Sequence, residues 1–493
     1  MDEIKRMLID GEWVLSDSGL YKDIINPADQ SKIATVTRGT KEDVQKAVKA
    51  AKRAYYDDGW CDVTITQRSQ LLNQFADEME RNVVELATLE TLNTGKAYLE
   101  SEYDVYDSAA CVRYYADLIN KPMEQTYTVA DPNIKTMLVR EPIGVVGMIS
   151  AWNFPISLAI WKIAPALAAG NAIVFKPAEI TPLSAILLFE LLQKVGFPRG
   201  VINLVLGSGS VVGNEIAENP EIDKVAFTGG IQAGRAIMRA AAGNMKGISL
   251  ELGGKSPCIM FADADFATAV DYALYGMFYN QGEVCSASSR ILVEATFYDL
   301  FMNTMIAKTK QIKIGNGLSE GVRMGPLISE EQLNTVLEYV EIGIKEGATL
   351  AYGGKRLSEG EYAKGFFMEP TIFTDVTPDM TIVREEIFGP VVVIQKFHTE
   401  EEAIRLANDT EYGLAAGVFS SDSEKALRVV GKLRAGITWI NTYGPVYPQA
   451  PWGGYKRSGI GRELGTLGLE DYTEVKQINI NLKPQPTGWF EPQ

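Results

Sequence analysis

The stretch Gly144-Val145-Val146-Gly147-Met148-Ile149 opens the clearest pattern in this chain, an alternation of short apolar runs with helical segments between residues 143 and 253. The apolar runs are 144–149, 172–176, 201–206, 224–228 and 248–252, and the helical segments between them are 155–169, 182–195, 210–218 and 231–242. Strands that alternate with helices through short connections predict an α/β fold with a doubly wound parallel sheet. Ligands bind such sheets at the carboxyl ends of the strands. Lys176, Gly209, Gly229 and Glu251 lie at or just after such ends, which predicts a binding site there.

The sequence before this sheet is mainly helical in pattern after a short start. Residues 40–55 carry a helical stripe of apolar residues, and Thr40 with Asp43 resembles a capping box. Helical patterns continue to about residue 120. The polar stretch 121–135 lacks helical periodicity, so we expect extended strands there.

A second α/β region is expected from 254 to 455. It should contain a helix near 266–280 and strands at 289–294, 390–397, 413–419 and 436–441. The tail 474–482 alternates like an edge strand, and a terminal strand on an open edge favours pairing with another subunit.

Composition narrows the classes of function. The chain has 493 residues, which predicts two large domains, and a net charge of −16, which disfavours nucleic acid and anionic membranes as partners. The apolar stretch 156–175 contains Lys162 and Pro165 and is expected to be a buried helix and strand. Four cysteines without a CxxC pair and a single histidine predict no disulfide framework and no structural metal. A reducing, cytoplasmic location is the expectation.

Cys285 is the candidate nucleophile. It lies among small residues in Gly282-Glu283-Val284-Cys285-Ser286-Ala287, which indicates an exposed turn, although most unpaired cysteines are core residues. A thiolate attacks carbonyl carbon and can form a thioester. The only histidine, His398, is far away in sequence, so a Cys-His hydrolase is disfavoured.

Two further side chains complete a possible site. Glu251 ends an apolar run, where burial would raise its pKa and suit it to be a general base; the alternative is a solvated glutamate. Asn153 could cap the helix that begins at Pro155, or its amide could donate to an oxyanion.

Glycine-rich turns suggest a nucleotide. One begins near Gly207 and Gly209 and another at Gly229, each before a helix, and neither has the exact dinucleotide spacing. Either helix N-terminus could hold a pyrophosphate, or each could be a simple tight turn. Glu179, in Lys176-Pro177-Ala178-Glu179, could accept ribose hydroxyls, or form a surface pair with Lys176. A carboxylate there would repel a 2′-phosphate, so NAD is favoured over NADP.

These residues together resemble the aldehyde dehydrogenase superfamily, and the resemblance covers nearly the whole chain. The motifs that carry it are Trp152-Asn153-Phe154-Pro155, Lys176-Pro177-Ala178-Glu179, Phe227-Thr228-Gly229, Leu250-Glu251-Leu252-Gly253-Gly254-Lys255, Gly282-Glu283-Val284-Cys285, Glu385-Glu386-Ile387-Phe388-Gly389-Pro390 and Gly461-Arg462-Glu463-Leu464-Gly465. The resemblance implies a Rossmann-like NAD-binding domain (1–120 and 143–253), an α/β catalytic domain (254–455) and a small β oligomerisation arm (121–142 and 470–493). It also implies a homo-oligomer, either a dimer or a tetramer.

The resemblance implies roles for particular residues. Cys285 would be the nucleophile, its own N–H and Asn153 would hold the oxyanion, and Glu251 would activate water, with Lys162 and Glu463 as proton-relay partners. The implied cofactor-binding residues are Ser150, Ala151, Trp152, Lys176, Ala178, Glu179, Gly209, Phe227, Thr228, Gly229, Gly230, Leu252, Glu386 and Phe388. The implied reaction is thiolate attack on an aldehyde, hydride transfer to NAD, and hydrolysis of the thioester to the carboxylic acid.

Two positions depart from the family pattern. Glu283 stands where the family commonly has glutamine, which would add a charge near the nucleophile. Gly230 stands where serine is common, which removes one hydrogen bond that could reach the cofactor.

The aldehyde is less well determined. Trp452, in Ala450-Pro451-Trp452-Gly453, resembles the betaine aldehyde and amino-aldehyde branch, and Trp161, Phe154, Tyr279 and Tyr447 would add aromatic walls. Aromatic faces attract quaternary ammonium groups, by roughly 0.5–2 kcal/mol each. Such walls equally suit aliphatic, aromatic or retinoid-like aldehydes.

Two hypotheses from other classes of function are also compatible with the sequence. The chain could be a non-catalytic NAD-binding or structural descendant of the fold, or a thiol esterase. A CoA-linked acylating dehydrogenase is a rival of the same class, which Glu251 disfavours because a water-activating base would waste the thioester.

Overall fold

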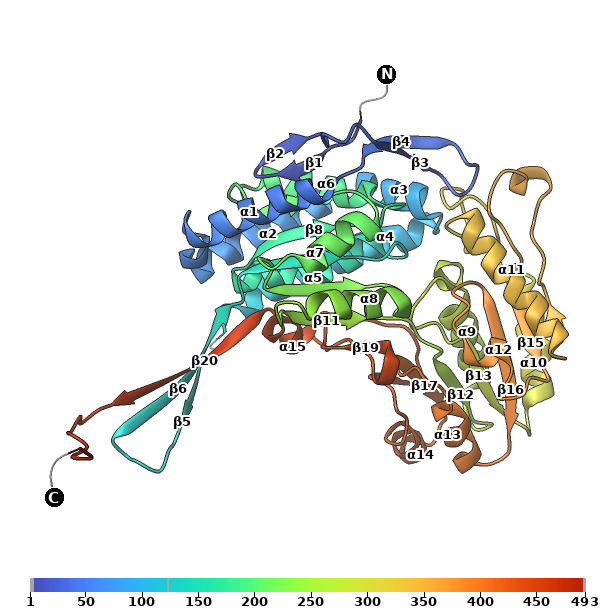
Figure 1. Cartoon of the computed structure of the whole chain (residues 1–493). Coiled ribbons are helices and arrows are strands. Elements are labelled where there is room, and N and C mark those ends of the chain that lie inside the picture. The colour runs from blue at the N-terminus through green and yellow to red at the C-terminus, as the bar shows by residue number, and fades with distance from the viewer. Residues whose placement is uncertain (1–3, 122–123, 491–493) are drawn as a thin grey trace.

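The computed structural model describes residues 4–121 and 124–490 and contains two large sheets, each flanked by helices (Figure 1). The first sheet has eight strands in the order β19-β11-β10-β7-β8-β9-β1-β2. Its five central strands are parallel: β7 (Val145–Ile149), β8 (Ala172–Lys176), β9 (Ile202–Leu204), β10 (Lys224–Thr228) and β11 (Gly247–Glu251). The order reverses between β7 and β10, which makes the sheet doubly wound, as predicted.

Helices connect these parallel strands where the pattern predicts them. They are α5 (Pro155–Ala169), α6 (Leu183–Lys194), a π-helical turn (Gly209–Gly213) that continues into α7 (Asn214–Glu218), and α8 (Ile231–Ala241). The chain returns to this sheet late, because β19 (Gly459–Ile460) pairs antiparallel with β11.

The N-terminal part contains strands that the sequence pattern did not predict. They are β1 (Met7–Ile9), β2 (Glu12–Val14), β3 (Tyr21–Ile25) and β4 (Lys32–Thr37); β1 and β2 extend the first sheet, and β3 and β4 form a separate pair. Helices follow, namely α1 (Lys41–Tyr56), α2 (Ile65–Arg81), α3 (Val83–Thr94) and α4 (Tyr98–Leu118). The predicted capping box is confirmed at α1, where Thr40 and Asp43 bond reciprocally.

The second sheet has seven strands in the order β14-β15-β16-β13-β12-β17-β18. They are β12 (Pro257–Met260), β13 (Arg290–Glu294), β14 (Thr349–Tyr352), β15 (Thr371–Thr374), β16 (Val391–Phe397), β17 (Ala415–Phe419) and β18 (Ile437–Ile440). The helices of this region are α9 (Phe266–Phe278), α10 (Tyr298–Thr309), α11 (Glu330–Lys345), α12 (Thr381–Arg384), α13 (Glu400–Asn408) and α14 (Ser423–Val430). The predicted helix near 266–280 and the four predicted strands are confirmed.

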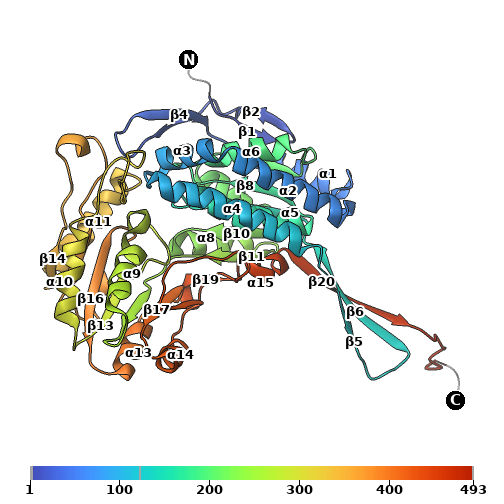
Figure 2. The ribbon, with the colours of Figure 1, turned by 180° about the vertical axis from the view of Figure 1, so that it is seen from behind.

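A three-stranded sheet projects from the body of the molecule (Figures 1 and 2). It consists of β5 (Gln125–Tyr127), β6 (Ile134–Pro142) and β20 (Thr473–Asn481), with β20 at one edge, next to β6. The short helix α15 (Gly465–Glu470) leads into β20. Residues 1–3, 122–123 and 491–493 of the predicted domain and arm ranges lie outside the described residues.

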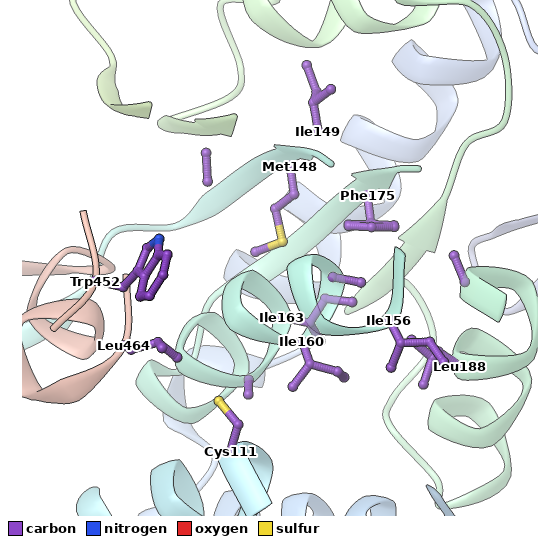
Figure 3. Packing of buried hydrophobic residues seen from close by; sticks show 14 of the residues in the cluster. Cys111, Met148, Ile149, Ile156, Ile160, Ile163, Phe175, Leu188, Trp452 and Leu464 are labelled. Carbon is purple, nitrogen blue, oxygen red and sulfur yellow. The ribbon is translucent and has the colours of Figure 1, made fainter. Parts of the chain in front are cut away.

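The core beside the first sheet is built around α5. All but one of its fifteen residues are buried, and Lys162 is the single charged one. Figure 3 shows Ile156, Ile160 and Ile163 of α5 among side chains from β7, β8, α4 and α6, with Trp452 and Leu464 beside them. Tight packing on every side fixes the position of Lys162. None of the described helices combines the length and apolarity needed to cross a membrane.

Candidate active site

A cavity of about 420 Å³ contains Cys285, Glu251 and Asn153 in its wall. Glu251 is the last residue of β11, and Asn153 lies in the loop between β7 and α5. Cys285 follows the turn Tyr279–Gly282 that succeeds α9. The carboxyl ends of two parallel strands and a turn from the second domain therefore supply the three groups to one space.

Glu251 is desolvated, as its place at a strand end suggested. Only 5 % of the residue is exposed, and neither carboxylate oxygen has a hydrogen-bond partner among the described residues. Burial, and next the neighbouring Glu463 carboxylate, raise the pKa of Glu251 well above its usual range. A carboxylate whose pKa is raised holds a proton more strongly, which suits it to act as a general base.

The thiol of Cys285 is protonated at neutral pH in the structure described here. Burial is the main cause that raises its pKa to about 12, and the carboxyls of Glu251 and Glu386 add to it. Main-chain N–H groups of Cys285 and Ser286 act in the opposite direction, because they favour the thiolate. The thiol must therefore lose its proton as it attacks.

Asn153 is not a helix cap. Phe154 occupies the N-cap position of α5 and makes no side-chain cap, so the capping interpretation is wrong. The Asn153 amide instead donates from Nδ2 to the main-chain oxygen of Glu283 at 3.0 Å. An amide nitrogen carries two hydrogens, so one remains to donate to an oxyanion.

Lys162 and Glu463 lie next to each other beside the cavity. The Lys162 ammonium is fully buried, donates to Thr228 Oγ1 at 2.6 Å and forms an ion pair with Glu463. Glu463 and Thr228 both line the cavity with Glu251. A chain of proton-carrying groups therefore runs along this wall.

Eight of the fourteen residues predicted to bind the cofactor line the same cavity, among them Glu386 and Phe388, which were predicted for its nicotinamide half. They are Ala151, Trp152, Thr228, Gly229, Gly230, Leu252, Glu386 and Phe388. The Glu386 carboxylate accepts from the Gly254 N–H at 2.9 Å, and a Cβ added at Gly253 would lie 1.9 Å from it. Phe388 has a φ of 57°, a rare conformation for a bulky residue, and contacts Trp152 edge to face at 5.2 Å.

The residues predicted for the adenosine half lie at the end of β8. Ala178 and Glu179 share a small hollow with Arg38, and Lys176 donates to the Pro177 carbonyl at 2.8 Å, with burial lowering its pKa to about 8. Glu179 does not pair with Lys176: its Oε1 lies 2.8 Å from Arg38 Nε. No pattern in the sequence singles out Arg38.

This surface fits a dinucleotide. A Cβ added at Gly209 or Gly230 would meet no atom within 4 Å, so both glycines face open space. Gly230 caps α8 without a side-chain bond, which leaves the first N–H groups of α8 available to a phosphate. Ser150 is buried, and its hydroxyl has no hydrogen-bond partner among the described residues, whereas Phe227 is buried against Gly229.

Four of the five predicted aromatic residues line the cavity. The rings of Trp161 and Trp452 are 5.5 Å apart, and those of Phe154 and Tyr279 are stacked at 6.4 Å. The prediction for Tyr447 is wrong, because it does not line the cavity and its side chain is 60 % exposed. Tyr443 takes a place in the wall instead, and its hydroxyl donates to the Ser286 carbonyl at 2.6 Å.

The sequence also gave no reason to single out two carboxylates, Asp104 and Asp107 of α4, which line the cavity. Their spacing of three puts them on one helix face, which is the signal that could have found them. Lys96 is fully buried, pairs with Asp104 at 2.7 Å and lies 4.0 Å from the centre of the Phe154 ring. Asp107 makes no ion pair with a described residue.

Glu283 does not place its charge at the nucleophile. Its carboxyl accepts from the Ile328 N–H at 3.0 Å and from Gln281 Nε2 at 3.3 Å. Burial raises its pKa to about 8, so it is largely protonated at neutral pH. The prediction of an extra charge near the nucleophile is therefore wrong, both because the carboxyl is bonded elsewhere and because it is largely protonated. The side chain instead anchors the turn.

Comparisons with known proteins agree with this geometry. Residues 13–478 match the model of the aldehyde dehydrogenase family. The chain is 51% identical over 484 residues to a betaine aldehyde dehydrogenase of Bacillus subtilis (98% of this chain, 99% of that protein). It is 44% identical over 494 residues to a peroxisomal aminoaldehyde dehydrogenase of Pisum sativum (99% and 98%).

A solved structure shares the fold. The betaine aldehyde dehydrogenase of Staphylococcus aureus, crystallised with NAD⁺, superimposes with a TM-score of 0.97 at 49% identity, covering 99% of this chain and 97% of that one. The match of the family model over almost the whole chain shows that this protein belongs to the aldehyde dehydrogenase family.

Proposed function

We propose that this protein oxidises an aldehyde to its carboxylic acid with NAD, through a covalent intermediate on Cys285. The observation that carries the proposal is that Cys285, Glu251 and Asn153 share one cavity with Trp152 and Glu386. An isolated thiol would support an esterase and an isolated nucleotide groove a binding protein. A thiol and a nucleotide groove that share one cavity support a dehydrogenase.

The proposed chemistry uses the groups in turn. The Cys285 thiol loses its proton and attacks the aldehyde carbon, and the Asn153 amide and the Cys285 N–H stabilise the resulting oxyanion. Bound NAD supplies the hydride acceptor that converts the thiohemiacetal to a thioester. Glu251 then takes a proton from water, which hydrolyses the thioester to the acid.

The proton taken by Glu251 has a route to leave. Glu463 shares the cavity wall with Glu251 and is ion-paired with Lys162, which in turn donates to Thr228. We propose that these groups accept the proton and so return Glu251 to its basic form for the next turnover.

NAD is the proposed cofactor. Glu386 and Phe388 would hold its nicotinamide half, the start of α8 its phosphates, and Glu179 with Lys176 its adenosine ribose. The presence of NAD⁺ in the related Staphylococcus aureus structure supports this assignment.

A small cationic aldehyde, such as betaine aldehyde or an amino-aldehyde, is the proposed substrate. The predicted aromatic residues Phe154, Trp161, Tyr279 and Trp452 line the cavity, and an aromatic face attracts an ammonium group by roughly 0.5–2 kcal/mol. Asp107 adds a carboxylate without an ion-pair partner among the described residues, which also favours a cation. The names of the Bacillus subtilis and Pisum sativum relatives support the same class.

A broad-range dehydrogenase for neutral aldehydes is the second candidate. The cavity has several apolar walls, including Leu158, Val446 and Pro448, that would bury an uncharged chain equally well. The two candidate functions differ in one respect: only the first predicts that a positive charge on the substrate raises kcat/KM.

The remaining assignments follow from the fold. We propose that residues 1–120 and 143–253 form the cofactor domain, 254–455 the catalytic domain, and 121–142 with 470–493 an oligomerisation arm. We also propose a homo-oligomeric, cytoplasmic enzyme.

One experiment tests both the reaction and the substrate. NADH formation is measured with betaine aldehyde and with 3,3-dimethylbutanal, its neutral isostere, in which carbon replaces the nitrogen. We expect kcat/KM to be at least about tenfold higher for the cation, since one cation–π contact of about 1.4 kcal/mol suffices for that factor. Equal values would favour the broad-range candidate, and activity that survives Cys285→Ala would refute the proposed chemistry.

A further inference from the structure

The turn that precedes Cys285 has an unusual backbone. Asn280 has φ 47° and ψ 43°, Gln281 has φ 46° and ψ 31°, and Gly282 has a φ of 73°. Left-handed conformations cost non-glycine residues roughly 1–2 kcal/mol each, and asparagine is among the residues that tolerate them best. Such a turn persists only where its surroundings fix it.

The Asn280 side chain is one of the groups that fix it. The residue is 1 % exposed, and its Nδ2 donates to the Asn153 carbonyl at 3.0 Å and to the Glu283 carbonyl at 3.2 Å. Its Oδ1 accepts from Gln281 Nε2 at 3.0 Å. Both hydrogens and the oxygen of the amide are therefore in use.

Asn153 and Asn280 share one acceptor. The Asn153 Nδ2 donates at 3.0 Å to the same Glu283 carbonyl that accepts from Asn280. Both lone pairs of this oxygen are thereby occupied, and Asn280 also bonds to the main chain of Asn153. The Asn280 side chain therefore bonds to both segments, the one that carries the oxyanion amide and the one that carries the nucleophile.

We infer that Asn280 is a positioning residue for the oxyanion donor. It holds the main chains of Asn153 and Glu283 together, so that the Asn153 amide keeps one hydrogen on Glu283 and directs the other into the cavity. Asn280 does not line the cavity and acts only through Asn153. This inference rests on the proposed function, in which Asn153 stabilises the oxyanion.

The physical reason is preorganisation. Removal of one oxyanion donor typically costs about 10²–10³ in kcat, because the donor must already be oriented when charge develops on oxygen. Loss of Asn280 frees the Glu283 carbonyl and the Asn153 main chain, so that the Asn153 amide can turn away. We expect a smaller loss than that caused by deleting Asn153 itself.

The test is a double-mutant cycle with Asn153→Ala and Asn280→Gly. Glycine keeps the left-handed backbone and removes only the side chain. Asn280→Asp keeps the shape but replaces the donor with an oxygen that faces two carbonyls. A matched control is Asn203→Ala, since the Asn203 amide is also buried and also bridges two carbonyls, those of Ile173 and Gly200, but lies outside the cavity.

We expect Asn280→Gly to lower kcat and kcat/KM by the same factor, about tenfold or more, with the NAD dissociation constant unchanged. Asn280→Asp should lose at least as much. The double variant should be no slower than Asn153→Ala, because Asn280 acts through Asn153. Asn203→Ala should lower the melting temperature and keep kcat/KM per folded enzyme.

Three results would overturn the inference. The first is a wild-type kcat/KM in Asn280→Gly. The second is a double variant in which the two losses of kcat/KM multiply. The third is an equal loss of kcat/KM in Asn203→Ala, because destabilisation alone would then explain the loss in Asn280→Gly. If Asn153→Ala itself keeps full activity, the oxyanion role in the proposed function fails first, and that result is distinct from the other three.

Discussion

Among the individual residues of the site, Cys285 and Glu251 both have raised pKa values that bear on their proposed roles. Burial and neighbouring carboxyls disfavour the charged forms of both groups, so both pKa values are raised. Neither group is held in an ion pair with a described residue.

Glu251→Gln is expected to separate the two halves of the reaction. Oxidation should proceed to one equivalent of NADH per site, and thioester hydrolysis should slow by about 10²–10⁴-fold, the usual contribution of a general base. Stopped-flow absorbance would show a burst followed by slow turnover. In the wild-type enzyme the hydrolysis rate should rise with pH, since the raised pKa of Glu251 makes the basic form scarce at low pH. Full steady turnover by Glu251→Gln would remove the residue from the mechanism.

Glu283→Gln tests the anchor of the catalytic turn. The folded pKa of about 8 lies above the value of about 4.3 for an unfolded glutamate, so the folded state retains a proton that the unfolded state loses. Wild-type stability should therefore fall as pH rises from about 4.3 to 8, by at most about 1.4 kcal/mol per unit, and then level off. Glutamine lacks this titration, so the melting temperature of the variant relative to wild type should be higher at pH 8 than at pH 5. Parallel melting curves for the two proteins would contradict the buried, protonated state.

Arg38→Ala tests cofactor choice. Arg38 pairs with Glu179, which is proposed to hold the adenosine ribose, so its removal would leave the negative charge of Glu179 uncompensated against a 2′-phosphate. We expect kcat/KM with NADP to fall by about tenfold or more and kcat/KM with NAD to change little. Lys32→Ala, which removes an exposed ion pair on β4 with Asp23, serves as the control. An equal loss with both cofactors would assign Arg38 to structure alone.

At the scale of the element, the edge of β20 is the exposed feature of the arm. Val475 and Ile480 of β20, and Leu482 just after it, are 53 %, 42 % and 59 % exposed, and no described strand pairs with the outer edge of β20. An edge strand of this kind invites another strand or subunit. The arm is therefore the element on which the proposed assembly depends.

Charges placed on this edge should prevent assembly. Val475→Lys combined with Ile480→Lys is expected to reduce the molar mass measured by light scattering to that of a smaller assembly or a monomer. Gln477→Lys, which adds a charge without removing apolar surface, should leave the mass unchanged. An unchanged mass in the double variant would exclude β20 as the assembly surface.

The elements that the sequence predicted are those with a regular period. The parallel strands from Val145 to Glu251 and the helices between them were predictable, because apolar runs and helical stripes repeat there over more than a hundred residues. The strands β1 and β2 have three residues each, which is too short for any period to be recognised. Tyr447 was misplaced because its loop has no period from which an orientation could be inferred.

Charged residues set a second limit on prediction. Asp104, Asp107 and Arg38 look like ordinary surface residues in the sequence, and only the packing of α4 and β8 brings them to the cavity and the ribose hollow. The motif residues Cys285, Glu251 and Asn153 were predictable because their neighbours are distinctive. Their hydrogen bonds, including those of Asn280, were not, since they join positions about 130 residues apart.

At the scale of the whole molecule, a net charge of −16 should affect the encounter with substrate. A negative protein concentrates cations at its surface, and salt screens this attraction beyond about 10 Å at 0.1 M. We expect kcat/KM for betaine aldehyde to fall as ionic strength rises from about 0.01 to 0.5 M, and kcat/KM for 3,3-dimethylbutanal to stay constant. Equal salt dependence for both aldehydes would show that salt acts on the enzyme and not on the encounter.

The pairing of β11 with β19 has a consequence for biosynthesis. Leu250 and Glu251 obtain their outer strand partners from Gly459 and Ile460, residues that leave the ribosome some two hundred positions later. During synthesis the strand that ends in Glu251 therefore has a bare edge, exposed to any nascent chain nearby. A chain released before Gly459 should lack a closed site and be cut readily by proteases at this edge, so we expect activity to appear only after Gly459 and Ile460 have been made.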